Sequence, residues 1–369
     1  MQIQDIEVIP FSIPCAYPIR ISAGVMEAVQ NVLVRITTDT GVAGLGETQP
    51  LPSLQGCSET QASVVEVITK AYAPLLLGRS PIHIGKILED LDGAARGNFP
   101  AISAVGDALY DLLAKSLGVP LYTLLGGLYR DCIEMVWSVG MKSTAEMVSE
   151  ARRAMDRGYR KLKIKVGSHE AAEDVEHAFE VRKAIGVHAS FRIDANGGLT
   201  LAGALNLLKA LKGVGLEFVE QPLPVWDIDG LSQLSGLIDI PIMADESCHS
   251  VHSALELVKK QAAAIFDIKL MKNGGIHNAR KVAAVAQAAN IPIYSGGNVG
   301  SSIGAGAAAH FYASTPNVIA GDFNLGPCGW LTADLAKQPL HVEGPFAFVP
   351  KGPGIGIDLD EKKLAKYKV

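Results

Sequence analysis

Two lysines separated by one residue, Lys163 and Lys165, lie in the short stretch 160–167, in which basic and apolar residues alternate. Side chains two residues apart on a β-strand point to the same face, so both ammonium groups would enter one space. Two buried ammonium groups lower each other's pKa, which would suit one of them to act as a base. The alternative for this stretch alone is a surface strand with solvated lysines.

Further charged residues follow at regular intervals. From Lys163 the successive steps to Asp194, Glu220, Asp245 and Lys269 are 31, 26, 25 and 24 residues. A repeat of this length is typical of the strand-and-helix unit of a (β/α)8 barrel, whose strand ends carry the active site. Each of these residues alone could form a buried ion pair with a neighbour. Their common spacing favours a single shared site.

The types of these residues indicate a reaction. Three carboxylates on adjacent strands, Asp194, Glu220 and Asp245, would repel one another, and such oxygen ligands suit Mg²⁺, with Mn²⁺ as a substitute. Lysines would stand on both sides of the metal, and a lysine among other cations can reach a pKa of roughly 7–8. A metal beside a substrate carboxylate stabilises the enediolate that forms when the neighbouring carbon loses a proton. The sequence therefore predicts proton abstraction next to the carboxylate of a small substrate.

The elements that must position these residues alternate from about residue 130 onward. Amphipathic helices separate eight candidate strands, and the chain lacks the Gly-x-Gly-x-x-Gly turn of a dinucleotide-binding open sheet. We therefore expect an α/β fold with a (β/α)8 TIM-type barrel, in preference to a doubly wound sheet. The candidate strands are 133–139, 161–166, 191–195, 217–221, 241–245, 265–270, 291–295 and 318–323.

The first part of the chain has a different pattern. Strand and hairpin signals precede two helical segments, at about 59–77 and 101–117, which predicts an α+β capping domain. The stretches 14–30 and 48–58 lack regular periodicity and are expected to be loops, either ordinary connections or a lid over a site, and their length favours the lid. We predict a capping domain at 1–125, a barrel at 126–325 and a segment at 326–369 that returns to the cap.

Composition excludes several classes of partner. The 369 residues carry a net charge of −5 with both signs interspersed, so no basic face for nucleic acid is expected. The five cysteines are scattered and odd in number, which indicates reduced thiols. The first residues lack the pattern of a signal peptide, and no apolar run reaches about 18 residues. These features predict a cytoplasmic protein without a membrane segment.

Several motifs together resemble the enolase superfamily, in its muconate-lactonizing (mandelate racemase/muconate lactonizing enzyme) subgroup, over the whole chain. They are Lys-Ile-Lys at 163–165, Asp-Ala-Asn at 194–196, Glu-Gln-Pro at 220–222, Ala-Asp-Glu-Ser at 244–247, Asp-Ile-Lys-Leu-Met-Lys-Asn-Gly-Gly at 267–275, and Asp-Ala-Leu-Tyr-Asp at 107–111 with Leu-Leu-Gly-Gly at 124–127. That superfamily is a known case of Mg²⁺ combined with a lysine base.

The resemblance implies roles for individual residues. Mg²⁺ would be bound by Asp194, Glu220 and Asp245, and Lys165 and Lys269 would be the acid and base. Lys163 would hold the substrate carboxylate and depress the pKa of its neighbour. Asn196 would support the metal ligands, and Glu246 would stand behind Lys269. By the same analogy the protein forms a homo-oligomer.

Individual members of the subgroup are matched in different places. Residues 242–275 and 136–139 look most like muconate cycloisomerases. Asp322-Phe323-Asn324 is similar to the Asp-x-Asp with which dipeptide epimerases hold an ammonium group, except that Asn324 replaces the second Asp. Gly300 stands where both groups carry a Glu, which predicts a wider pocket at one wall.

We expect an isomerase acting through an enediolate, most like a muconate cycloisomerase. The alternatives are a racemase or epimerase of an amino-acid derivative or dipeptide, a hydroxy-acid dehydratase, and a non-catalytic protein that binds a metal and a carboxylate. His310, within an apolar helix, is interpreted as a core residue. The substrate pocket is predicted to include five residues, which are Ile19, Leu54, Trp137, Asn298 and Asp322.

Overall fold

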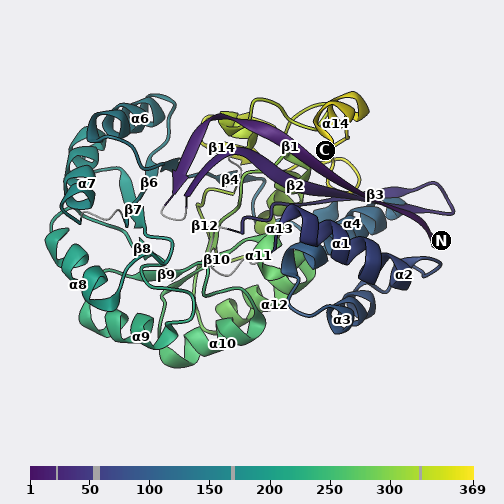
Figure 1. The fold of residues 1–369 in the computed structure, drawn as a ribbon, viewed down its shortest axis with the longest axis horizontal. Coiled ribbons are helices and arrows are strands. Elements are labelled where there is room, and N and C mark those ends of the chain that lie inside the picture. Colours follow the sequence, from purple (N-terminus) through teal and green to yellow (C-terminus); the bar gives the residue numbers. More distant parts are fainter. Residues whose placement is uncertain (22–23, 53–58, 168–170, 324–325) are drawn as a thin grey trace.

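The computed structural model describes residues 1–21, 24–52, 59–167, 171–323 and 326–369, and its largest sheet is a ring of eight parallel strands (Figure 1). The ring closes where Met135 and Gly321 form a parallel bridge, because the amide of Val136 donates to the carbonyl of Gly321 at 2.8 Å. The predicted (β/α)8 barrel is therefore confirmed. Its strands, in order around the ring, are β5 (Trp137–Val139), β6 (Lys161–Lys165), β7 (Ser190–Asp194), β8 (Val219–Glu220), β9 (Ile242–Ala244), β10 (Ile265–Ile268), β11 (Ile293–Ser295) and β12 (Val318–Ile319).

Helices surround the ring on its outer side (Figure 1). Several begin at a side-chain cap: Ser143 and Ser250 form capping boxes, and Thr200 and Asp227 each accept an amide hydrogen bond. These caps fix where each helix begins after the preceding loop. The helices are α6 (Thr144–Asp156), α7 (Ala171–Ile185), α8 (Leu201–Ala210), α9 (Ile228–Leu237), α10 (Val251–Lys260), α11 (Leu270–Asn273), α12 (Gly275–Ala288) and α13 (Ser302–Ala313).

The N-terminal part is a strand-rich cap with an antiparallel sheet of β1 (Ile3–Ile21), β2 (Gly24–Thr38) and β3 (Ala43–Thr48). The long helix α4 (Phe99–Leu117) packs directly on β3, and a Cβ at Gly46 would lie 2.0 Å from the carbonyl oxygen of Ala104. Only glycine permits this approach. The other helical segments of the cap are α1 (Gln61–Glu66), η1 (Val67–Tyr72), α2 (Ala73–Leu76), α3 (Ile84–Ala94) and α5 (Leu121–Leu124).

Two expectations about local structure were wrong. Most of the stretch 14–30, expected to be a loop, forms the end of the β1–β2 hairpin, where Ile19 pairs with Met26. The register shifts between Pro14 and Ile19, and prolines in this outer strand interrupt the alternation that marks a strand. The expected strand 133–139 is two strands, because β4 (Cys132–Glu134) joins a separate small sheet while β5 joins the barrel.

The C-terminal stretch contacts both parts of the molecule. In the small sheet, β14 (Phe346–Phe348) lies between β13 (Val342–Glu343) and β4. Beyond α14 (Glu361–Tyr367), the amide of Val369 donates to the carbonyl of Pro10 in β1 at 3.1 Å. Within the described ranges, no helix is long and apolar enough to cross a membrane.

Candidate active site

The lysine pair of β6 lies at the C-terminal end of the barrel strands. Lys163 is buried, and its Nζ lies 2.8 Å from Glu220 and 2.8 Å from Asp322. Lys165, two residues further along the same face, forms an ion pair with Asp194. The predicted convergence of both ammonium groups on one acidic space is therefore present.

The parallel register explains why the carboxylates meet these lysines. Lys165 pairs with Asp194 across β6 and β7, and Asp194 pairs with Glu220 across β7 and β8, so the three residues lie at one level. Asp245 directly follows β9, and Lys269 directly follows β10. Lys269 forms an ion pair with Asp245, and its Nζ lies 3.5 Å from Asp267.

The order of strands places two of the lysines across the barrel from each other. β6 and β10 are four positions apart in a closed ring of eight strands. Strands separated by half the ring lie on opposite sides of a barrel. The strands that carry Asp194, Glu220 and Asp245 occupy the arc between them. Lys165 and Lys269 therefore approach the carboxylates from opposite sides.

The pKa values of two lysines in the cluster are raised, whereas the sequence led us to expect that they would be lowered. Burial lowers the pKa of Lys269, but Asp245 and Asp267 outweigh it and hold that pKa well above the usual value. The same balance, dominated by Asp322 and Glu220, raises the pKa of Lys163. The sequence pattern led us to expect lowered values, because it showed the neighbouring lysines but not how closely the carboxylates pair with them.

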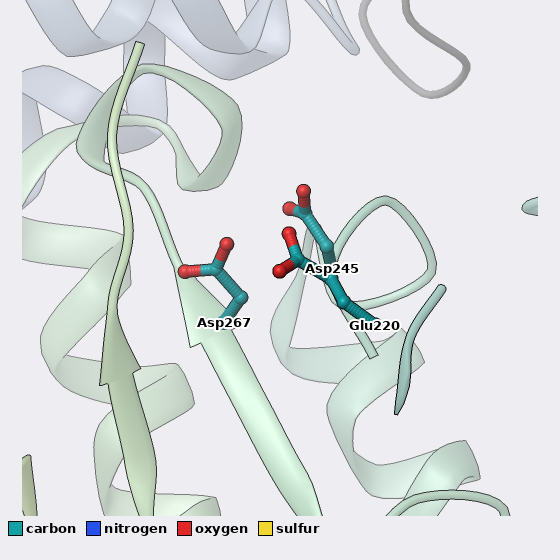
Figure 2. A group of neighbouring side chains, drawn as sticks. All are labelled: Glu220, Asp245 and Asp267. Atoms are coloured by element: carbon teal, nitrogen blue, oxygen red, sulfur yellow. The ribbon is translucent and has the colours of Figure 1, made fainter. Parts of the chain in front are cut away.

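A group of three buried acidic residues offers oxygen ligands to a metal ion. One oxygen each of Glu220, Asp245 and Asp267 lies within 4.8 Å of the others, and Figure 2 shows the three side chains as neighbours. Glu220 Oε1 and both carboxylate oxygens of Asp267 are buried without a hydrogen-bond partner in the described part of the chain. Asp267 was not among the predicted ligands. Asp194, which was, pairs with Lys165 and Lys163.

The formal charges also fit a divalent cation. With every group counted as charged, six carboxylates face four ammonium groups, which gives a formal charge of −2 before any ion or substrate is present. An all-oxygen set with this charge suits a hard divalent cation. The carboxylates are Asp194, Glu220, Asp245, Glu246, Asp267 and Asp322, and the ammonium groups are Lys163, Lys165, Lys269 and Lys272.

The two predicted supporting residues contact each other. Asn196 has a positive φ of 44° and donates its amide to Asp194 at 2.9 Å, while its side chain donates to Glu246 at 3.2 Å. A non-glycine residue in this backbone region is often part of a functional site. Burial raises the pKa of Glu246 to about 8. Glu246 therefore lies beside Asn196, whereas the direct ion-pair partners of Lys269 are Asp245 and Asp267.

Gln221 and Lys272 position Asp245, and neither was singled out from the sequence. The side-chain oxygen of Gln221 accepts the amides of Asp245 at 3.0 Å and Ser247 at 3.1 Å. The ammonium of Lys272 lies 3.0 Å from Asp245 Oδ1 and donates to the carbonyl of Asp267 at 2.8 Å. Both residues lie within the quoted motifs, but bonds to the backbone of another strand leave no sequence pattern of their own.

A cavity of about 520 Å³ opens above the cluster, between the barrel and the cap. Three of the predicted pocket residues, Ile19, Asn298 and Asp322, line it, together with Lys163, Lys165 and Lys269. Leu54 lies outside the described residues, as does Asn324.

Trp137 is not among the lining residues of this cavity. Its indole donates to Glu150 on α6 at 3.1 Å and packs edge-on against Tyr159. The alternation of β5 turns the next residue, Ser138, into the cavity, where its hydroxyl donates to Asp322 at 2.7 Å. We predicted that the larger residue, Trp137, lines the pocket, but the alternation of side chains along β5 places the smaller one, Ser138, there.

Gly300 does not line the main cavity either. A Cβ at this position would lie 2.7 Å from Gln49 Nε2 and 2.8 Å from Glu47 Oε1. Side chains from the cap therefore occupy the space that the glycine leaves, and the expected widening of the pocket at this wall is not found.

Comparisons with known proteins agree with this arrangement. Residues 146–363 match the family described as enolase C-terminal domain-like, and residues 4–126 match the mandelate racemase/muconate lactonizing enzyme N-terminal domain. The chain is 36% identical to L-Ala-D/L-Glu epimerase of Bacillus subtilis over 97% of both chains. It is 34% identical to muconate cycloisomerase 1-2 of Acinetobacter lwoffii, over 100% of this chain and 96% of that one.

A solved structure gives the same result in three dimensions. The dipeptide epimerase of Cytophaga hutchinsonii, complexed with Mg and D-Ala-L-Val, superposes with a TM-score of 0.94 at 30% identity, over 100% of this chain and 99% of that one. The lysine and carboxylate constellation, the barrel and these matches together show that the chain belongs to the enolase superfamily, in its mandelate racemase/muconate lactonizing enzyme group.

Proposed function

We propose that this protein is a Mg²⁺-dependent isomerase that removes the proton next to the carboxylate of a small substrate and returns a proton through an enediolate. The observation that carries this proposal is the position of Lys165 and Lys269 on opposite sides of the ring, with acidic residues on the arc between them. A carbon held in that gap meets a proton acceptor on one face and a proton donor on the other.

The metal in this proposal is held by Asp194, Glu220 and Asp245, with Asp267 beside them. When bound, the cation stabilises the negative charge that develops on the substrate carboxylate. A cation at this position would share the oxygens that pair with Lys165 and Lys269, and it would thereby lower the raised pKa of Lys269 toward the range of a base. Support for Mg²⁺ comes from the unpartnered oxygens of the acidic group and from the related dipeptide epimerase, whose structure contains Mg.

The protein's own residues divide the remaining work. Lys163 neutralises the substrate carboxylate from the floor of the cavity. One of Lys165 and Lys269, in its neutral form, takes the α-proton, and the other, as an ammonium, gives a proton to the opposite face. The carbon thereby changes configuration with no net gain or loss of protons. The buried walls exclude water, which strengthens each of these interactions.

Two opposed lysines favour racemisation or epimerisation over cycloisomerisation. Inversion at carbon needs a group on each face, whereas the addition of a carboxylate across a double bond needs one group to protonate the enolate. Asp322 lines the cavity, and its Oδ1 has no hydrogen-bond partner among the described residues. A carboxylate at this wall of the cavity is suited to accept the N–H next to the α-carbon of an amino-acid derivative.

Cycloisomerisation is the second candidate, and Asp322 also supplies the observation that favours it. Its other oxygen already pairs with Lys163 at 2.8 Å and accepts from Ser138 at 2.7 Å. The negative charge of Asp322 is therefore largely neutralised, which weakens it as a partner for a free ammonium. The similarity to muconate cycloisomerase 1-2 agrees with this reading.

Stereospecific exchange in D₂O tests the proposal. The Mg²⁺-loaded protein is incubated with both enantiomers of N-acyl amino acids, with dipeptides and with cis,cis-muconate, and deuterium at the α-carbon is followed by proton NMR. We expect exchange with inversion for an amino-acid derivative. Lys165→Met should abolish exchange from one enantiomer and Lys269→Met from the other, each by at least about 10³-fold, because each base reaches one face.

Lys161→Met is the matched control, since Lys161 lies on the same strand and pairs with Glu134 outside the cluster at 2.6 Å. It should keep both exchange reactions. Muconolactone formation without α-exchange would move the assignment to the cycloisomerase. Loss of neither reaction in the Lys165 and Lys269 variants would refute the proposed roles.

A further inference from the structure

The cavity has two chemically different ends. Its floor, at the barrel strands, carries Lys163, Lys165 and Lys269 together with Asn196 and Asp322. Its far wall is built by the β1–β2 hairpin, the segment after β3 and a tryptophan from the C-terminal stretch. The larger apolar side chains of that wall are Ile19, Val25, Met26, Val29, Leu51 and Trp330, and its polar members include the neutral amides Gln30, Gln49 and Gln61. In Figure 1 the hairpin reaches from the cap across the barrel.

The charges on the lining are unevenly distributed. Among the described lining residues, every cation belongs to the floor, where Lys163, Lys165 and Lys269 already face carboxylates. The ionisable residue on the cap side of this lining is the acidic and exposed Glu27. A second carboxylate on the substrate would lie near this acidic residue, with no cation among the described lining residues of the cap side to pair with it. Repulsion between like charges makes that placement unfavourable.

We propose that the substrate is an amino-acid derivative with one carboxylate, held at the floor, and an apolar side chain that occupies the cap end of the cavity. This rests on the proposed function, because the floor is assigned to the carboxylate by the reaction. It deepens that function by excluding dicarboxylates, such as muconate or acylated acidic amino acids, as preferred substrates.

The volume and the lining support this substrate class. A cavity of about 520 Å³ lies within the range of sites that enclose a drug-sized ligand. Ile19, Val29 and Trp330 are almost fully buried, so a side chain placed against them leaves water. Each buried methylene group adds a factor of about four in affinity.

A near-isosteric pair of ligands tests the inference. N-acetylleucine and N-acetylaspartate share the acetamide and the α-carboxylate, and they differ in whether the side chain ends in two methyl groups or a carboxylate. Exchange in D₂O is measured for both, with N-acetylalanine as the short reference and cis,cis-muconate as the dicarboxylate. The α-methyl analogues of the first two lack the α-proton, so calorimetry on the Mg²⁺-loaded protein measures their binding without reaction.

We expect N-acetylleucine to exchange at least about tenfold faster than N-acetylaspartate and N-acetylalanine. The α-methyl analogue of the leucine compound should likewise bind at least about tenfold more tightly than that of the aspartate compound. Val25→Lys adds a cation to the cap wall, at a residue that is 55% exposed and so tolerates the change. It should improve binding of the α-methylaspartate compound about threefold. The matched control is Val187→Lys, at an 82% exposed valine between α7 and β7, which should alter neither preference.

The two readouts separate this inference from the function on which it rests. Selective binding of the leucine analogue without exchange of any substrate would keep the inference and remove the proposed function. If the aspartate compound exchanges as fast as the leucine compound or faster, the proposed function would stand and the inference would be overturned. Conversion of muconate faster than any acyl amino acid, or no binding of either analogue, would overturn the inference.

Discussion

At the scale of single residues, the site is a set of carboxylates whose oxygens are shared between lysines and a metal position. Lys163 and Lys165 pair with Glu220 and Asp194, which are two of the oxygen donors that a cation would use. Removing one carboxylate charge should therefore weaken metal binding more than it lowers the stability of the fold. Glu220 is the best position to test, because its Oε1 has no partner while its Oε2 holds Lys163.

Glu220→Gln keeps the shape of the side chain and removes the charge. We expect the wild-type protein to gain about 2.7 kcal/mol of unfolding free energy when free Mg²⁺ is 100-fold above its dissociation constant. The variant should lose most of this gain, as measured by thermal unfolding with and without Mg²⁺. Asp107→Asn is the control, since Asp107 is also buried but accepts the amide of Ile276 away from the cluster. An equal Mg²⁺ effect in Glu220→Gln would contradict the metal assignment.

At the scale of elements, the sequence was informative where side-chain chemistry follows strand periodicity. The alternation of β6 predicts that Lys163 and Lys165 share a face, and the repeat length predicts that Asp194, Glu220 and Asp245 meet, since parallel strand ends lie at one edge. The face of β5 that is turned toward the cavity could not be predicted in the same way. Trp137 and Ser138 alternate, and the sequence does not say which of them faces inward.

Contacts between distant elements were beyond sequence reasoning, and the link from β3 to α13 is an example. Glu47 on β3 is buried at the start of α13, where Oε1 accepts the amide of Ser301 at 2.9 Å and Oε2 accepts that of Gly304 at 3.1 Å. Residues 47 and 301 are far apart in the chain, and no local pattern joins them. A carboxylate at a helix N-terminus is stabilising, and here it fastens the cap to the barrel.

Glu47→Gln tests this link. In either orientation of the amide, the NH₂ group faces a backbone N–H, because Ser301 donates to one oxygen and Gly304 to the other. We expect the free energy of unfolding to fall by about 1–3 kcal/mol, measured by urea denaturation. Glu89→Gln, at a side chain that is 75% exposed on α3, should change it by less than about 0.5 kcal/mol. Equal stability of the two variants would show that Glu47 does not hold the two parts together.

At the scale of the whole molecule, the cap and the barrel share one continuous core, so groups at their junction affect the stability of the entire chain. His310 on α13, interpreted from the sequence as a core residue, is fully buried there. Its Nδ1 accepts the amide of Tyr122 at 3.2 Å, and its ring stacks on that tyrosine on α5. The neutral ring is therefore the form that the folded state holds.

Acid should destabilise the protein through this residue. Burial lowers the pKa of His310 from 6.5 to about 4. Because the pKa is lower in the folded state, the unfolded chain binds the proton first. The stabilising contribution is then complete above pH about 6.5 and is lost as the pH falls toward 4, by about 3 kcal/mol.

His310→Asn retains an acceptor for the Tyr122 amide and removes the titrating ring. We expect the variant to be less stable at pH 7, because the ring's packing is lost, but to show a shallower decline in unfolding free energy between pH 6.5 and 4. Urea denaturation across that range measures the slope. His341→Asn, at an exposed histidine, should leave the wild-type slope unchanged. If the unfolding free energy of His310→Asn declines as steeply as that of the wild type, acid must destabilise the fold through other groups. His310, at the junction between α5 and α13, would then not be the group that makes stability depend on pH.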